Sequence, residues 1–236
     1  MSATDFGTLD TEKRQKLEDC TRKLDVILEK KNLHQTKARV VFVLDHSGSM
    51  RTLYKDGTVQ NTLERIFPVA LRFDDDGEMQ FYLFDTDYQE LDPVSLNNLG
   101  GYTENVILKK MGKYGQTRYA PAMNTILHRY AEKESSHTPT FVIFITDGDN
   151  SDKAAAKQSL IAASHHNIFW KFVGIGKEGF PFLEKLDDLE GRYVDNANYI
   201  SIPDLNTIKD ETLYERLMEE YDNWRHAAKH AGIRVK

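Results

Sequence analysis

Apolar residues follow two alternating patterns along the chain: short continuous runs, and longer stretches with three- and four-residue spacing. The continuous runs are rich in β-branched and aromatic residues, which is typical of strands covered on both faces. They predict strands at residues 38–45, 78–85, 140–147, 168–176 and 192–195, with an edge strand at 88–92. The spaced stretches predict amphipathic helices at residues 11–32, 58–73, 119–133, 152–165, 181–189 and 211–230.

This alternation predicts an α/β fold with a doubly wound, mostly parallel six-stranded sheet flanked by helices. A chain of 236 residues has room for one such unit. We expect residues 1–36 to form an N-terminal helical extension packed on the domain. Residues 37–236 should form the domain itself, including its C-terminal helix. Pro68 is expected to bend or interrupt the helix at 58–73.

Charge and cysteine content argue against several classes of function. The chain has 31 Lys and Arg against 37 Asp and Glu, with no basic block, so we expect no nucleic-acid partner. Its one cysteine, Cys20, cannot form an intramolecular disulfide, which favours a reducing compartment. No apolar run approaches the ~20 residues that span a bilayer. We therefore expect a soluble, cytoplasmic protein that does not contact a membrane.

Oxygen-bearing side chains stand at the ends of two predicted strands. Asp45 ends the first strand and is followed by Ser47 and Ser49, and Asp147 ends the strand at 140–147. Ligands of doubly wound sheets bind beyond the carboxyl ends of the strands, so we expect the two carboxylates to face each other there. Two neighbouring carboxylates that both stay ionised imply a cation between them. Hard oxygen donors favour Mg²⁺, Mn²⁺ or Ca²⁺ over zinc.

The segment DHSGS at residues 45–49 resembles the Asp-x-Ser-x-Ser signature of von Willebrand factor A (vWA) domains. The metal-ion-dependent adhesion site of that family (MIDAS) also uses a threonine from a later loop and an aspartate at the end of the fourth strand. The resemblance implies that the serines bind the metal directly, that the threonine binds it directly or through water, and that the aspartates hold the ion or its waters. The implied metal ligands are Asp45, Ser47, Ser49, Thr117 and Asp147.

Longer stretches narrow the resemblance. LEKKNLHQTKARVVFVLDHSGSM and LERIFPVALRFDDDGEMQFYLFDT resemble the bacterial TerF-like vWA proteins associated with tellurium and toxic-cation resistance. The resemblance implies a Rossmann-like fold and a non-catalytic module that binds a protein partner with the help of a divalent cation, in tellurite or chemical stress resistance. The partner would present an Asp or Glu carboxylate to the metal.

The alternative is a metal-dependent phosphatase of the haloacid dehalogenase type, which also has an Asp at the end of its first strand. Such an enzyme needs a second carboxylate two residues later as its general acid, and position 47 is Ser. Its later Gly-Asp-x-x-x-Asp spacing would place an Asp where the chain has Lys153. A second motif, GIGKEG at residues 174–179, matches a dinucleotide fingerprint literally but follows the fifth strand. We interpret its glycines as turn residues.

Overall fold

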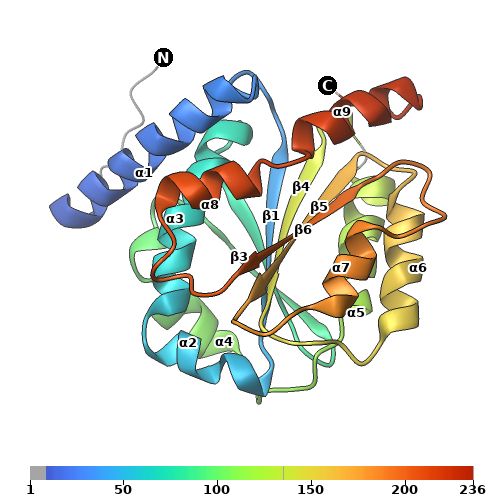
Figure 1. Cartoon of the computed structure of the whole chain (residues 1–236). Coiled ribbons are helices and arrows are strands. Elements are labelled where there is room, and N and C mark those ends of the chain that lie inside the picture. Colours follow the sequence, from blue (N-terminus) through green and yellow to red (C-terminus); the bar gives the residue numbers. More distant parts are fainter. Residues whose placement is uncertain (1–8, 135, 236) are drawn as a thin grey trace.

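Six strands form one sheet in the order β3-β2-β1-β4-β5-β6 in the computed structural model, which describes residues 9–134 and 136–235 (Figure 1). The strands are β1 (Arg39–Asp45), β2 (Met79–Phe84), β3 (Tyr88–Val94), β4 (Thr140–Thr146), β5 (Ile168–Ile175) and β6 (Ala197–Ile202). The α-helices are α1 (Thr11–Lys30), α2 (Arg51–Lys55), α3 (Thr58–Phe73), α4 (Leu108–Lys110), α5 (Ala120–Leu127), α6 (Lys153–Ala163), α7 (Pro181–Asp187), α8 (Asp210–Leu217) and α9 (Tyr221–His230). Shorter helical turns are η1 (Gly48–Met50), η2 (Leu99–Gly101), η3 (Thr103–Ile107) and η4 (His128–Lys133).

The sheet confirms the predicted fold class. β3 pairs with β2 in antiparallel fashion, and every other neighbouring pair of strands is parallel. Of the predicted N-terminal extension, residues 1–8 lie outside the described residues, as does the last residue of the predicted domain, 236. No helix in the described part of the chain combines the length and apolarity that a membrane span needs.

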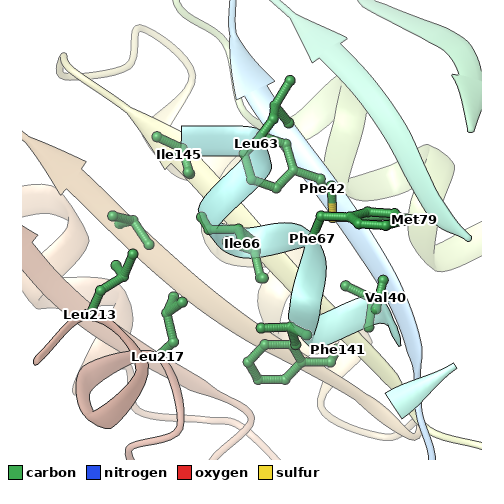
Figure 2. Packing of buried hydrophobic residues seen from close by; sticks show 14 of the residues in the cluster. Val40, Phe42, Leu63, Ile66, Phe67, Met79, Phe141, Ile145, Leu213 and Leu217 are labelled. Atoms are coloured by element: carbon green, nitrogen blue, oxygen red, sulfur yellow. The ribbon is translucent and has the colours of Figure 1, made fainter. Parts of the chain in front are cut away.

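Alternate residues of β1 pack in two apolar clusters, one on each face of the sheet. Val40, Phe42 and Leu44 belong to the cluster beneath α1, α3, α8 and α9, whereas Val41 and Val43 belong to the cluster beneath α5, α6 and α7. Figure 2 shows the first cluster, in which side chains of α3 and α8 lie over those of β1 and β4. Burial on both faces explains why these strands read as continuous apolar runs.

The sixth strand lies at Ala197–Ile202, so the strand predicted at 192–195 is wrong. Residues 192–195 are irregular, with a bend at 193–194, and the Arg192 guanidinium donates to the carbonyl of Leu189. β6 includes Asn198, a buried polar residue whose side chain accepts a hydrogen bond from Lys171 in β5. This contact between strands has no signal in local apolar spacing.

Of the two outcomes expected at Pro68, a bend or an interruption of the helix, the structure excludes the interruption, because α3 runs unbroken through this buried residue. Another helix prediction is wrong. The helix predicted at 211–230 is two helices, α8 and α9, separated by a turn in which Glu220 is left-handed, with φ 62°. The buried ammonium of Lys171 donates to the carbonyls of Arg216 and Glu219 at this turn. Those carbonyls have a partner outside the helix, which allows the helix to end there.

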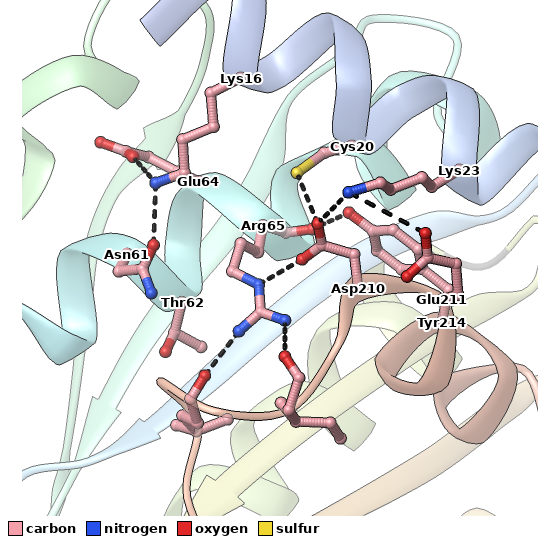
Figure 3. Close-up of polar contacts among 12 residues, drawn as sticks. Lys16, Cys20, Lys23, Asn61, Thr62, Glu64, Arg65, Asp210, Glu211 and Tyr214 are labelled. Carbon is pink, nitrogen blue, oxygen red and sulfur yellow. Dashed lines mark hydrogen bonds and ion pairs between the residues drawn. The ribbon is translucent and has the colours of Figure 1, made fainter.

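A polar cluster fastens α1 to the rest of the chain, and it centres on Asp210 at the start of α8 (Figure 3). The Asp210 carboxylate accepts hydrogen bonds from Lys23 of α1 at 2.8 Å and from Arg65 of α3 at 2.6 Å. Arg65 also donates to the carbonyls of Leu205 and Ile208. Three segments far apart in the sequence therefore share one carboxylate.

Asp210→Ala should destabilise the protein by about 2 to 3 kcal/mol, because it leaves the Arg65 guanidinium buried without its counter-charge. The Arg65 side chain is 7 % exposed. Urea unfolding at neutral pH measures the effect. Glu211→Ala is the matched control, since that neighbouring carboxylate is 53 % exposed and lies 4.0 Å from Lys23. Equal destabilisation by the two variants would contradict a central role for Asp210.

Candidate metal centre

The predicted site residues lie at the carboxyl ends of two adjacent parallel strands. Asp45 is the last residue of β1, and Asp147 comes directly after β4. The register of these strands pairs Leu44 with Ile145, so the carboxyl ends of β1 and β4 lie side by side. After β1 the chain passes Ser47 and turns through η1, which carries Ser49.

A continuous set of hydrogen bonds joins four of the five predicted residues. Asp45 Oδ1 accepts from the backbone N–H of Ser47 at 2.6 Å. The hydroxyls of Ser47 and Ser49 lie 3.0 Å apart, and Ser49 Oγ donates to Asp147 Oδ1 at 2.7 Å. The two serines and the two aspartates therefore occupy one cluster of oxygen atoms, as the sequence predicts.

Thr117 reaches the same edge of the sheet from the loop before α5. Its carbonyl accepts from the backbone N–H of Ser151 at 2.9 Å, and a Cβ placed on Gly148 would lie 4.0 Å from its Oγ1. Asp152 fixes this loop, because its carboxylate accepts from the N–H groups of Tyr119 and Ala120. Within the described residues, no hydrogen bond joins the Thr117 hydroxyl to the serines. The structure thus places Thr117 beside the loop of Asp147 without linking it to the cluster.

Burial governs the electrostatics of both carboxylates. It raises the pKa of Asp45 to about 6, against the lowering effect of hydrogen bonds from Thr146 and Ser47. Burial also raises the pKa of Asp147, while the hydrogen bond from Ser49 lowers it. The charge of Asp147 adds to the rise at Asp45. A cation at this edge would offset the cost that burial imposes on both negative charges.

The donor atoms fit a hard divalent cation. In the described part of the chain, no three His, Cys, Asp or Glu side chains come together in an arrangement that could hold a metal. A cation here would therefore rely on the serine and threonine hydroxyls in addition to the two carboxylates. Such an all-oxygen set suits Mg²⁺, Mn²⁺ or Ca²⁺, with water filling the remaining positions.

Several residues that support the site were not predicted. Thr146 donates to Asp45 Oδ2 at 2.6 Å. In the sequence, its position directly before Asp147 is the signal by which it could have been found.

Aromatic contacts also support the site. The His46 ring stacks on Tyr114 with centroids 4.6 Å apart, and the Arg51 guanidinium lies over the Tyr114 ring, 4.8 Å from its centroid. A β-bridge between Ser47 and residue 115 adds to these contacts. They hold the loop that leads to Thr117 against the end of β1.

Comparison with known proteins identifies relatives over nearly the whole chain. The family model described as "vWA found in TerF C terminus" matches residues 37–234. The protein YcbR of Bacillus subtilis (strain 168) is 41% identical over 230 residues, which are 97% of this chain and 90% of YcbR. The crystal structure of the ArnB paralog VWA2 from Sulfolobus acidocaldarius has a TM-score of 0.52 at 20% identity, covering 77% of this chain and 45% of that one. The SpRpn10 VWA domain has a TM-score of 0.54 at 12% identity, covering 77% and 94%. These two structures show a likeness of fold alone.

Asp45→Asn should remove part of the pH dependence of stability in the cation-free protein. The pKa of Asp45 is about 6 in the folded chain and about 4 in the unfolded chain, so the folded chain holds this proton to a higher pH. The contribution of Asp45 to the free energy of unfolding should therefore fall as the pH rises from about 4 to about 6, and then level off. We expect the variant to lose on the order of 2 kcal/mol of that fall.

Urea unfolding in chelator at several pH values measures this difference. Asp149→Asn is the control, because its carboxylate lies in the same loop and is 54 % exposed. It should keep the wild-type profile. An unchanged profile in Asp45→Asn would show that this carboxylate carries no burial cost.

Proposed function

The chain belongs to the TerF-like branch of the von Willebrand factor A family, and we propose that it is a protein-binding module that depends on a divalent cation. The cation, Mg²⁺ or else Mn²⁺ or Ca²⁺, would be held by the MIDAS-type residues at the end of the sheet. The ligands would be Asp45, Ser47, Ser49, Thr117 and Asp147.

The observation that carries this proposal is the cluster of oxygens formed by the Ser47 and Ser49 hydroxyls and the Asp147 carboxylate. The hydroxyl groups are neutral, so within the chain only the carboxylates of Asp45 and Asp147 would balance the charge of a divalent cation. An Asp or Glu carboxylate from a partner protein would add an oxygen ligand and a further negative charge at a coordination position that water otherwise fills. Cation and partner would then each strengthen the binding of the other, as linkage requires.

A non-catalytic role suits the chemistry of these side chains better than an enzymatic one. The serines bond to each other and to Asp147, and no histidine among the described residues hydrogen-bonds to their hydroxyls as the base of a serine nucleophile would. The Nδ1 atom of the neighbouring His46 lies 3.3 Å from a carboxylate oxygen of Asp85, so this nitrogen faces a carboxylate and not a serine. The phosphatase alternative would still lack a general acid at Ser47.

The family description supports a biological setting, since the matching family model is named after the C-terminal part of TerF. We extend the proposal to resistance against tellurite or related chemical stress, and to action in the cytoplasm. The stress-resistance role rests on the family resemblance, and the cytoplasmic location rests on the single cysteine and the lack of a long apolar run in the sequence.

Ser49→Ala should abolish capture of the partner protein. The immobilised wild-type chain should retain the partner from an extract of its native cell in Mg²⁺ and release it in EDTA. The variant loses a hydroxyl ligand and the hydrogen bond that orients Asp147, so it should retain little partner in either condition.

Ser95→Ala is the matched control, because Ser95 follows Val94, which pairs with Met79 at the amino end of β2, so it lies at the opposite end of the sheet from the proposed ligands. It should behave as the wild type does. Capture that persists in EDTA, or that is equal in both serine variants, would contradict the proposal. Turnover of a phosphate monoester that requires Mg²⁺ and Asp45 would favour the phosphatase instead.

A further inference from the structure

A pocket of about 90 Å³ opens directly beside the candidate metal centre, between the loop after β4 and the loop before α7. Asp147 lines this pocket and also accepts the hydrogen bond from Ser49, so a single side chain borders both features. A molecule that reaches the metal would therefore have its neighbouring groups at the mouth of the pocket. The other walls are Asp149, Glu178, Phe180, Phe182 and Leu183, among others.

The apolar walls are fixed by packing beneath them. Phe180 folds over β5 at Gly174, where a Cβ would come within 2.7 Å of the Phe180 ring, so only glycine leaves it room. Phe182 lies 6.1 Å from the Tyr119 ring, and the Tyr119 hydroxyl donates to the Gly148 carbonyl at 2.7 Å. The two aromatic walls are thus held in place by buried neighbours rather than by each other.

The open side of the pocket is acidic. Three carboxylates border it, on Asp147, Asp149 and Glu178. Lys153 pairs with Asp149, and its ammonium lies 5.8 Å from the Phe182 ring centroid. Within the described residues, Glu178 has no ion-pair partner. The chain's own lysine therefore shows that an ammonium group can lie between this aromatic wall and an acidic rim.

Building on the proposed function, we infer that this pocket binds a lysine or arginine side chain of the same partner that offers its carboxylate to the metal. The aliphatic stem of such a side chain would cover Phe180 and Phe182, and its charge would reach Glu178 and Asp149. A purely apolar side chain would bring these carboxylates against apolar surface without any compensation. Asp147 borders both features, and successive residues of an extended chain are about 3.3 Å apart, so the basic residue would lie within two positions of the acidic one.

Acetylated, amidated hexapeptides test this inference. Each peptide contains one Asp and one test residue, which is Arg, Gln, Leu or Glu. The test residue stands one or two positions before or after the Asp. Binding to the ¹⁵N-labelled full-length chain is followed by NMR at saturating Mg²⁺, after a titration with Mg²⁺ alone. At the best position the Arg peptide should bind about fivefold more tightly than the Gln peptide. The advantage should vanish in EDTA together with all peptide binding.

Two variants should change the ratio of Arg to Gln affinity in opposite directions. Glu178→Gln removes a rim charge and should bring the ratio close to one. Lys153→Gln removes the competing ammonium and should raise the ratio. Glu190→Gln, an exposed glutamate outside the pocket, is the control and should leave the ratio unchanged. Taking the ratio within each variant cancels any change in affinity for Mg²⁺ itself.

The outcomes separate this inference from the function on which it rests. No binding of Mg²⁺ would overturn the proposed function. Three outcomes in a chain that binds Mg²⁺ would overturn the basic pocket and leave the cation site standing. They are a preference for the Leu peptide, equal affinity for all peptides, and no binding of any peptide. An Arg preference that Glu178→Gln does not reduce would also overturn it, because the charge would then be recognised elsewhere.

Discussion

The burial of one carboxylate at the end of a central strand is the constraint on which the site depends. Asp45 has 0% exposure, and burial raises its pKa to about 6. Its oxygens are met by the Ser47 N–H and the Thr146 hydroxyl, which fix both the turn after β1 and the end of β4. A charge in such a place is costly unless a compensating charge is close by. A divalent cation held by the neighbouring hydroxyls would provide that compensation.

The loops around this carboxylate come from distant parts of the sequence, and side chains hold them together. Asp152 accepts from the N–H groups at the start of α5 and so fixes the segment that carries Thr117. The Tyr114 ring contacts both the His46 ring and the Arg51 guanidinium, and these contacts join the same segment to the end of β1. The edge of the sheet is therefore largely formed in advance, and a partner would meet a surface that needs little ordering.

The sequence predicted the parallel core because strands covered on both faces leave continuous apolar runs. It predicted the meeting of the serines with the two aspartates because carboxyl ends of neighbouring parallel strands converge. It did not predict the position of β6 or the break between α8 and α9. Lys171 contacts both places, since its buried ammonium binds Asn198 of β6 and the carbonyl of Glu219. Contacts between distant segments, such as the stack of Tyr114 on His46, leave no periodic pattern in the chain.

Crystals of the protein grown with Mn²⁺ offer the most direct test of the central claim, because anomalous scattering locates this ion without ambiguity. The proposed cation site should give one strong peak at the carboxyl end of the sheet. The Ser47 and Ser49 hydroxyls should lie at about 2.2 Å from it, as oxygen ligands of such an ion do, and Asp45 and Asp147 should hold its waters or bind it. A fully occupied ion bound elsewhere, or no ion at this edge at millimolar Mn²⁺, would contradict the account.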